Sequence, residues 1–188
     1  TYELIENMFS TLAECFTSRK IHIGMDEAFM VGLGNYRTKH GICDRYDLLV
    51  RHLNKVVEIA EKYNFHPMMW SDMFFRMSNN GEYYVNKTEI PEDVISKIPD
   101  VSLVYWDYYH RHKMDYANMI KAHKQFNKDI WFAGGAWTWN GFAPSNDITL
   151  KTMKPAMDAC RENGVNQIFL TLWGDNGKEC SYFTVLPS

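Results

Sequence analysis

Residues 44–70 read DRYDLLVRHLNKVVEIAEKYNFHPMMW, and this stretch decides the fold class. Asp44 stands where its side chain can cap the first turn of a helix that is predicted to run to residue 63. The apolar residues of that helix recur every three or four positions and so share one face: Leu49, Leu53, Val56 and Ala60. Residues 66–70 then form a short apolar run that is typical of a buried strand. A one-faced helix joined to a buried strand is the repeating unit of α/β proteins.

Four more strands and four more helices are predicted around this unit. Apolar runs predict strands at residues 21–25, 101–106, 130–133 and 167–172. Helices are predicted at residues 1–18, from Pro91 onward, at residues 114–126, and up to Gly164, which is a good C-terminal cap. Proline is unfavourable inside a helix, so Pro155 predicts that the regular part of the last helix begins only near Thr152. Five strands that alternate with five helices predict an α/β fold with parallel strands.

The adjacent carboxylates Asp26 and Glu27 directly follow the apolar run 21–25. Barrel enzymes place their reactive groups at such strand ends. Two like charges that are side by side and partly shielded from water cannot both ionise at ordinary cost, so one carboxyl is expected to keep its proton. That carboxyl could act as a general acid near neutral pH. A solvated acidic turn without a catalytic role is the alternative.

Tryptophans recur near the ends of the later apolar runs, each with a polar or aromatic partner two positions on. The pairs are Trp70 with Asp72, Trp106 with Tyr108, Trp137 with Trp139, and Trp173 with Asp175. Side chains two apart on an extended strand point the same way, so all pairs are expected to face one pocket. Indole rings stack on the apolar faces of pyranoses, and carboxylates bond sugar hydroxyls, so the predicted pocket suits a sugar. Core packing is the alternative for any single tryptophan, because large aromatic side chains dominate cores.

The segment His22-Ile23-Gly24-Met25-Asp26-Glu27 resembles the His-x-Gly-x-Asp-Glu signature of family 20 glycoside hydrolases, the exo-acting β-N-acetylhexosaminidases. Residues 106–109 (WDYY) and 172–177 (LWGDNG) are similar to strand-end segments in one bacterial branch of that family. The resemblance extends from His22 to Leu186. Met25 departs from the commonest form of the signature, which has a second glycine at that position.

The resemblance implies a (β/α)8 TIM barrel in which the signature carboxylates follow the fourth strand. On that alignment residues 1–188 form a partial glycoside hydrolase catalytic domain. The expected structure is an incomplete barrel that covers strands 4 to 8 and lacks strands 1 to 3. Such an arc would leave apolar strand edges unpaired, so either self-association into a homo-oligomer through these edges or a rearranged edge is expected.

The same resemblance implies retaining hydrolysis of terminal, non-reducing N-acetyl-β-D-hexosamine residues. In substrate-assisted glycosidases the 2-acetamido oxygen of the substrate attacks the anomeric carbon, so no protein nucleophile is required. Glu27 would be the catalytic acid and base, and Asp26 would orient the acetamido group and stabilise the oxazolinium-like intermediate. The residues expected to bind the substrate are His22, Trp70, Asp72, Trp106, Tyr108, Trp137, Trp139, Trp173 and Asp175.

Individual roles within the binding set also follow from the resemblance. Trp137, Trp139 and Trp173 are assigned to the walls around the acetamido methyl group and the sugar ring. Tyr108 is the expected donor to the acetamido oxygen, and Asp175 is expected to bind sugar hydroxyls. The chemistry requires no cofactor and no metal ion.

Two other functions stay open. The first is a barrel glycosidase with a conventional carboxylate pair, in which Glu27 is the acid and Asp72 or Asp175 the nucleophile. Such an enzyme would also cleave sugars that lack a 2-acetamido group. The second is a non-catalytic carbohydrate-binding protein, which would bind sugars without turnover. His22 has two possible roles: its ring could support the carboxylate loop by hydrogen bonding, or it could contact the ligand directly.

Composition limits the function classes further. With 188 residues, 46% of them hydrophobic and 15% aromatic, the chain can bury one core but not two full domains. The net charge of -3 provides no basic field for nucleic acid or an anionic membrane, which favours a neutral or weakly charged ligand. The family resemblance implies that the partners are N-acetylhexosamine-containing glycans. No run approaches the ~20 apolar residues of a membrane span, and no signal peptide is visible. The four cysteines lack metal-like spacing, which favours reduced thiols and a cytoplasmic location.

Overall fold

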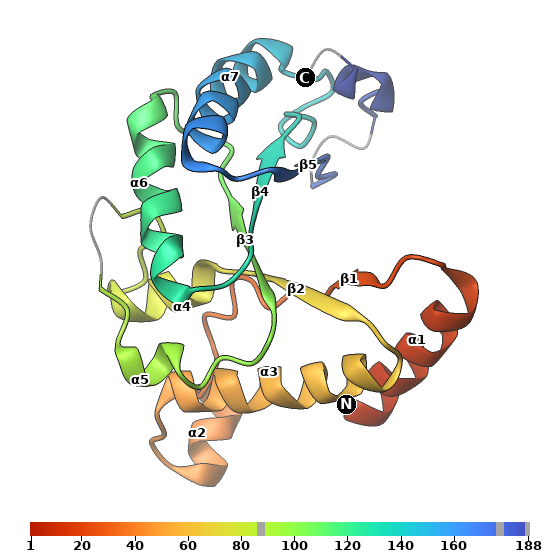
Figure 1. Cartoon of the computed structure of the whole chain (residues 1–188), viewed down its shortest axis with the longest axis vertical. Helices are drawn as coiled ribbons and strands as arrows, with labels where there is room; N and C mark the ends of the chain where they lie inside the picture. The colour runs from red at the N-terminus through yellow and green to blue at the C-terminus, as the bar shows by residue number, and fades with distance from the viewer. Residues whose placement is uncertain (86–88, 176–178, 187–188) are drawn as a thin grey trace. The chain divides into compact units, whose positions relative to one another are not determined.

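Helices and strands alternate along the computed structural model, which describes residues 1–85, 89–175 and 179–186 (Figure 1). The helices are α1 (Tyr2–Cys15), α2 (Gly34–His40), α3 (Arg45–Lys62), α4 (Asp72–Ser78), α5 (Glu92–Ile95), α6 (Lys113–His123) and α7 (Asn146–Asn163), with 3-10 turns at Lys124–Phe126 and Tyr182–Val185. The strands are β1 (Lys20–His22), β2 (His66–Trp70), β3 (Ser102–Trp106), β4 (Ile130–Gly135) and β5 (Gln167–Thr171). They follow the sheet order β1-β2-β3-β4-β5, and the pairs β1–β2 and β4–β5 are parallel. The α/β prediction is confirmed, whereas the assignment to strands 4 to 8 of a barrel stays a prediction.

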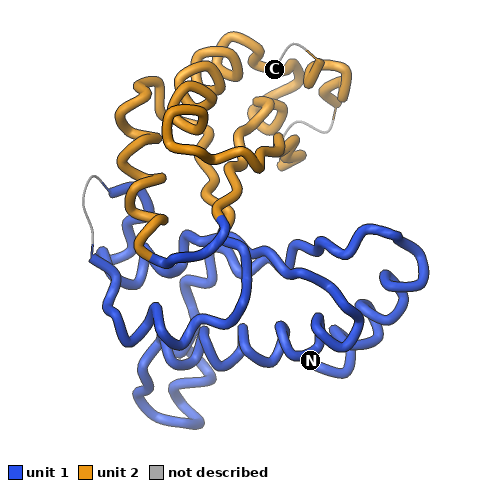
Figure 2. Tube along the Cα trace, viewed as in Figure 1, with its two compact units in different colours: residues 1–103, 126–129 blue, residues 104–125, 130–188 orange. Residues whose placement is uncertain are grey.

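The chain consists of two compact units (Figure 2). Unit 1 comprises residues 1–103 and 126–129, and unit 2 comprises residues 104–125 and 130–188. The carboxylate motif at residues 22–27 belongs to unit 1. Most of the tryptophan pairs belong to unit 2.

In unit 1 the helices α1 and α3 lie against each other, and α3 contacts β2. Asp44 caps α3 as predicted, since its side chain accepts a hydrogen bond of 3.0 Å from the backbone N–H of Asp47. The two helices and the strands enclose a small apolar core that contains Phe9, Val56, Ile59, Ala60 and Phe65. Ile21, Ile23 and Met25 pack against this core, which ties the segment that carries the carboxylates to the helices.

In unit 2 the helix α7 covers β4 and lies against α6. This helix runs unbroken through Pro155, so the prediction that it becomes regular only near Thr152 is wrong. Proline removes one backbone hydrogen bond, but the buried side chains on either side of it, Met153 and Ala156, anchor this turn in the core. Tertiary packing therefore outweighs the local cost of the proline.

The sequence pattern misses the short helices α2 and α4. Helix α2 buries none of its residues, so it carries no apolar periodicity that could reveal it. Helix α4 begins at Asp72, two positions after the last residue of β2, and its first four residues are all buried. Within the described ranges, no helix has both the length and the apolar character needed to cross a membrane.

Candidate active site

The carboxylates Asp26 and Glu27 lie in a sharp turn that follows β1. Pairing with β2 continues beyond the end of β1, because Ile23 N–H donates to the Met68 carbonyl (2.8 Å) and Trp70 N–H donates to the Gly24 carbonyl (3.0 Å). The backbone then adopts positive φ at Gly24 (75°), at Met25 (78°) and at Glu27 (48°). This turn takes both carboxylates away from the core, and both are exposed. Unit 1 alone does not supply the expected shielding from water, so the alternative of a solvated acidic turn stays open.

Met25 occupies the position at which the resembled signature usually has glycine. Its φ of 78° lies in the left-handed region, where a side chain costs about 1 kcal/mol or more. The backbone of this turn explains why glycine suits the position. Met25 offsets part of the strain, because its side chain packs against the apolar core of unit 1.

His22 and Trp70 lie side by side on the paired strands β1 and β2. Their ring centroids are 4.4 Å apart. Burial lowers the pKa of His22 to about 4, against the weaker raising effect of Asp26. The ring is therefore neutral near pH 7, and its Nδ1 accepts a hydrogen bond of 3.1 Å from Gly24 N–H. His22 thus supports the turn that carries the carboxylates, which is one of its two predicted roles.

Asp72 does not share an extended strand with Trp70, so that part of the prediction is wrong. Strand β2 ends at Trp70, and Asp72 is the first residue of α4. The residue is fully buried, and its Oδ2 accepts a hydrogen bond of 3.1 Å from Glu27 N–H. Burial raises the pKa of Asp72, although the bonds from Glu27 and Arg76 act in the opposite direction.

Unit 2 brings four of the predicted aromatic residues into one cluster. Trp106 stacks on Tyr108 with a centroid distance of 5.4 Å, and Trp137 stacks on Trp139 at 4.6 Å. Tyr108 meets Trp139 edge to face at 5.4 Å, and its carbonyl accepts a hydrogen bond of 2.8 Å from Trp137 Nε1. The Trp173 carbonyl accepts a 2.8 Å bond from the Thr138 hydroxyl, which ties the loop after β5 to the loop after β4.

The four tryptophan pairs do not occupy equivalent strand positions, contrary to the prediction. Trp70 and Trp106 are the last residues of β2 and β3, whereas the rings of residues 137, 139 and 173 lie in loops beyond β4 and β5. Within the cluster Tyr108 and Trp139 are 5% and 6% exposed, so their rings are largely committed to packing. Trp137 is half-buried and Trp173 is 38% exposed, so these two rings have surface left for a ligand.

Asp107 is a prominent polar residue to which the sequence pattern assigned no role. Its carboxylate is 1% exposed and accepts bonds from the Tyr105 hydroxyl (2.7 Å) and from the backbone N–H groups of Tyr109 (3.1 Å) and His110 (3.3 Å). The His110 ring bonds the same carboxylate at 2.7 Å, and this bond is the main cause that raises the pKa of His110. An aspartate that bonds the N–H groups two and three residues later is a known turn signal, which could have revealed this role.

The remaining predicted residue, Asp175, is exposed. Asn176 and Gly177, which belong to the segment of the family resemblance, lie outside the described residues. Among residues 1–85, 89–175 and 179–186 no group of three or more histidine, cysteine, aspartate or glutamate side chains could hold a metal ion.

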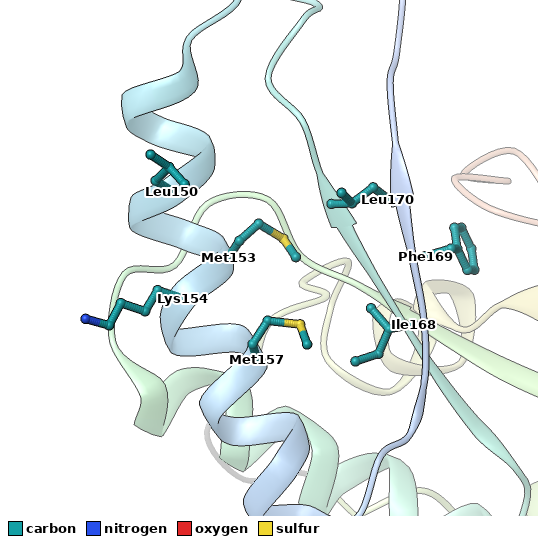
Figure 3. A pocket seen from close by; sticks show the side chains of 7 residues that line it. All are labelled: Leu150, Met153, Lys154, Met157, Ile168, Phe169 and Leu170. Atoms are coloured by element: carbon teal, nitrogen blue, oxygen red, sulfur yellow. The ribbon is translucent and has the colours of Figure 1, made fainter. Parts of the chain in front are cut away.

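An apolar groove in unit 2 contains none of the predicted site residues. It lies between α7 and β5, and Figure 3 shows Met153, Met157 and Ile168 directed into it. The rest of the lining is Leu150, Lys154, Phe169 and Leu170. The candidate site is therefore described by two local sets, His22 to Glu27 with Trp70 and Asp72 in unit 1 and the aromatic cluster in unit 2. Their convergence on one pocket stays a prediction.

No protein-family model and no curated protein sequence matches the chain. Solved glycoside hydrolase structures do resemble it. One β-N-acetylhexosaminidase matches with a TM-score of 0.58 and 14% identity, over 93% of this chain and 36% of that protein. The β-N-acetylhexosaminidase from Bacteroides fragilis matches with a TM-score of 0.50 and 16% identity, over 93% of this chain and 34% of its own. The fold of the chain is thus similar to part of the β-N-acetylhexosaminidase fold, and the chain spans about a third of these two proteins.

Proposed function

We propose that this chain forms the carboxylate-bearing part of a retaining β-N-acetylhexosaminidase that acts on terminal N-acetylhexosamine residues of glycans. The observation that carries the proposal is the turn after β1, in which adjacent Asp26 and Glu27 are held beyond the strand end. The strand ends are where barrel enzymes place their catalytic groups. The similarity of the fold to β-N-acetylhexosaminidases supports the same conclusion.

The proposed reaction has two steps in which Glu27 moves one proton. In the first step the acetamido carbonyl oxygen of the substrate bonds to the anomeric carbon, while the glycosidic C–O bond breaks. The Glu27 carboxyl gives its proton to the leaving oxygen, and the Asp26 carboxylate stabilises the positive charge of the oxazolinium. In the second step water adds to the anomeric carbon, its proton passes to Glu27, and the bond to the acetamido oxygen opens. Two inversions give retention of configuration.

The aromatic cluster of unit 2 is assigned to sugar binding in this proposal. Trp137 and Trp173 have exposed ring surface, so they are the candidates to stack on the sugar and its acetamido methyl group. Tyr108 would donate to the acetamido oxygen, and the exposed Asp175 would bind sugar hydroxyls. Asp72 is not proposed as a nucleophile, because its carboxyl is fully buried and already bonds Glu27 and Arg76.

Release of p-nitrophenol from its N-acetyl-β-D-glucosaminide tests the proposal, with the plain β-glucoside as the control substrate. Turnover of the acetamido substrate alone, lost in Glu27→Gln, is the expected result. Calorimetric titration with a thiazoline analogue of the oxazolinium intermediate provides a second reading, because binding is expected also in Glu27→Gln. Equal turnover of both substrates, or neither turnover nor analogue binding by the chain, would refute the proposal. Binding of N-acetylglucosamine without turnover would instead favour a non-catalytic carbohydrate-binding protein.

A further inference from the structure

The Glu27 turn is held by an ion pair on α4, between the buried Asp72 and the partly buried Arg76. Strand pairing brings the start of α4 next to the turn, because β1 and β2 run parallel in the register His22 to Met68. Asp72 Oδ2 accepts hydrogen bonds from Glu27 N–H (3.1 Å) and from Arg76 Nε (2.9 Å). One carboxylate oxygen therefore joins the turn to the helix.

Arg76 is fixed from several sides. Its Nη1 donates to the Gly81 carbonyl at 3.0 Å, and its guanidinium lies over the rings of Phe29 (5.1 Å) and Tyr83 (5.7 Å). Only 16% of the side chain is exposed. From this position its Nη2 approaches Glu27 Oε1 at 3.7 Å. These contacts restrain the position of the guanidinium, which faces the carboxylate of the proposed acid.

The two residues also explain each other's burial. An isolated buried carboxylate is costly, whereas a paired and hydrogen-bonded one is tolerated. Arg76 supplies the counter-charge on the next turn of α4, and the fully buried Asp72 in turn fixes the Arg76 side chain. Within the described part of the chain the second oxygen of Asp72, Oδ1, has no hydrogen-bond partner. The bonds made by Oδ2 are therefore the ones that keep this carboxylate in place.

The conformation of Glu27 requires such support. Its φ of 48° is unfavourable for a residue with a side chain, and strained backbones persist only where neighbouring contacts fix them. The bond from Glu27 N–H to Asp72 is one such contact, and the bond from Phe29 N–H to the Glu27 carbonyl (2.7 Å) is another. Because the first of these involves a charged acceptor, it is the stronger kind of bond.

We infer that Asp72 and Arg76 are positioning residues for Glu27: Asp72 fixes its backbone and Arg76 fixes the direction of its carboxylate. The inference rests on the proposed function for its catalytic part, while its structural part concerns the turn alone. Asp72 is thereby assigned to the support of the acid instead of to the sugar or to nucleophilic attack.

Amide hydrogen exchange at Glu27, followed by NMR, tests the structural part independently of activity. Asp72→Asn is expected to accelerate exchange of the Glu27 amide at least about tenfold, because the bond to a charged carboxylate is replaced at best by a weaker bond to a neutral amide oxygen. The matched control is Asp107→Asn, which removes another buried, multiply bonded carboxylate and should leave the Glu27 amide unchanged. Unchanged exchange in Asp72→Asn would overturn the inference.

Kinetics test the catalytic part. In Asp72→Asn and Arg76→Gln, kcat is expected to fall by up to about 100-fold, while KM stays within about twofold, because only the acid is misplaced. Arg76→Lys retains the charge and should recover part of kcat, and it also serves as the test if Asp72→Asn fails to fold. The charge control is Arg161→Gln, since the Arg161 side chain is exposed at the surface of α7, where it bonds Asp158.

The outcomes separate the two proposals. A fall in kcat that merely follows the folded fraction in thermal melts, without a change at the Glu27 amide, would reduce Asp72 and Arg76 to structural residues. A wild-type chain that neither turns over nor binds the acetamido substrate would refute the proposed function. In that case the exchange experiment would still decide whether Asp72 holds the turn.

Discussion

Replacing Gly135 by alanine should disrupt the aromatic cluster of unit 2. Gly135 is the last residue of β4, and a Cβ atom there would lie 2.7 Å from Cη2 of Trp139 and 2.9 Å from Cδ1 of Tyr108. Such distances are shorter than real Cβ contacts allow. Both neighbours are rigid rings that are themselves packed, Trp139 against Trp137 and Tyr108 against Trp106, so neither can move away alone.

The preceding residue, Gly134, provides a matched control. Successive residues of a strand face opposite sides, so a Cβ atom at Gly134 would point away from these rings. It would overlap the Sδ atom of Met153 and would lie 3.3 Å from Cε1 of Phe132, a tight but tolerable contact. Methionine is unbranched and flexible, so the end of this side chain can move at moderate cost. The two substitutions add the same methyl group at adjacent positions and differ in what that group meets.

The expected magnitudes follow from this contrast. Overpacking a well-filled core lowers the free energy of unfolding by about 1–3 kcal/mol. Replacing glycine by alanine also reduces the conformational freedom of the unfolded chain, which raises the free energy of unfolding by about 0.4–1 kcal/mol. Gly135→Ala should therefore lower the free energy of unfolding by about 1–2 kcal/mol, and Gly134→Ala by less than about 1 kcal/mol.

Urea unfolding followed by tryptophan fluorescence measures both values, and near-ultraviolet circular dichroism reports the Trp137–Trp139 stack. Gly135→Ala should change the dichroism more than Gly134→Ala does. If Gly135→Ala is as stable as the parent chain and leaves the dichroism unchanged, the close packing of β4 against the aromatic rings is wrong.

Three further predictions concern the turn and the histidines. Met25→Gly should be more stable than Met25→Ala by about 1 kcal/mol in urea unfolding, because only glycine relieves the positive φ; the reverse order would contradict the strain. Burial lowers the pKa of His123 to about 4, and its folded form is neutral, so stability should be fully present above pH 6.5 and fall as the pH drops toward 4. This contribution is at most about 3 kcal/mol, and thermal melts of His123→Gln should show a flatter pH dependence. The hydrogen bond with Asp107 raises the pKa of His110, so the His110–Asp107 pair stabilises the folded state below the ordinary histidine pKa. This stabilisation is lost as the pH rises through the pKa of the folded state, and His110→Gln should therefore lower the free energy of unfolding more at pH 6 than at pH 9.

The sequence predicts the regular elements well where apolar periodicity and buried position coincide. Helix α3 and strand β2 match their predicted ranges within a residue or two at each end. Helix α2 could not be found this way, because it buries no side chain. Helix α4 begins so soon after β2 that its apolar residues look like a continuation of the strand pattern. The continuity of α7 depends on contacts with the core, which local propensity does not contain.

Only part of the candidate site is predictable from the sequence. The adjacency of Asp26 and Glu27 and their place after a strand are visible in the sequence. The positive φ values of the turn are not, because the contacts that fix this backbone come from β2 and α4, which lie far from it in the sequence. The pair Asp72 and Arg76 was hidden for a related reason: a spacing of four indicates contact only on a helix, and this helix was not predicted.

Several supports of the carboxylate turn come from segments that pairing with β2 brings into place. The strand hydrogen bonds fix Ile23 and Gly24, the His22 ring lies against Trp70, and α4 starts immediately after the same strand and presents Asp72 to Glu27. Strand hydrogen bonds, ring packing and a bond to a carboxylate all restrain this short turn. Together they offset the free-energy cost of its strained backbone. It follows that the geometry of the proposed acid depends on contacts within unit 1, whereas the stacked and edge-to-face contacts described for the aromatic cluster join residues of unit 2. Gly135→Ala should therefore disturb the Trp137–Trp139 stack and leave the Glu27 amide protected. Asp72→Asn should expose the Glu27 amide to exchange and leave the stack intact.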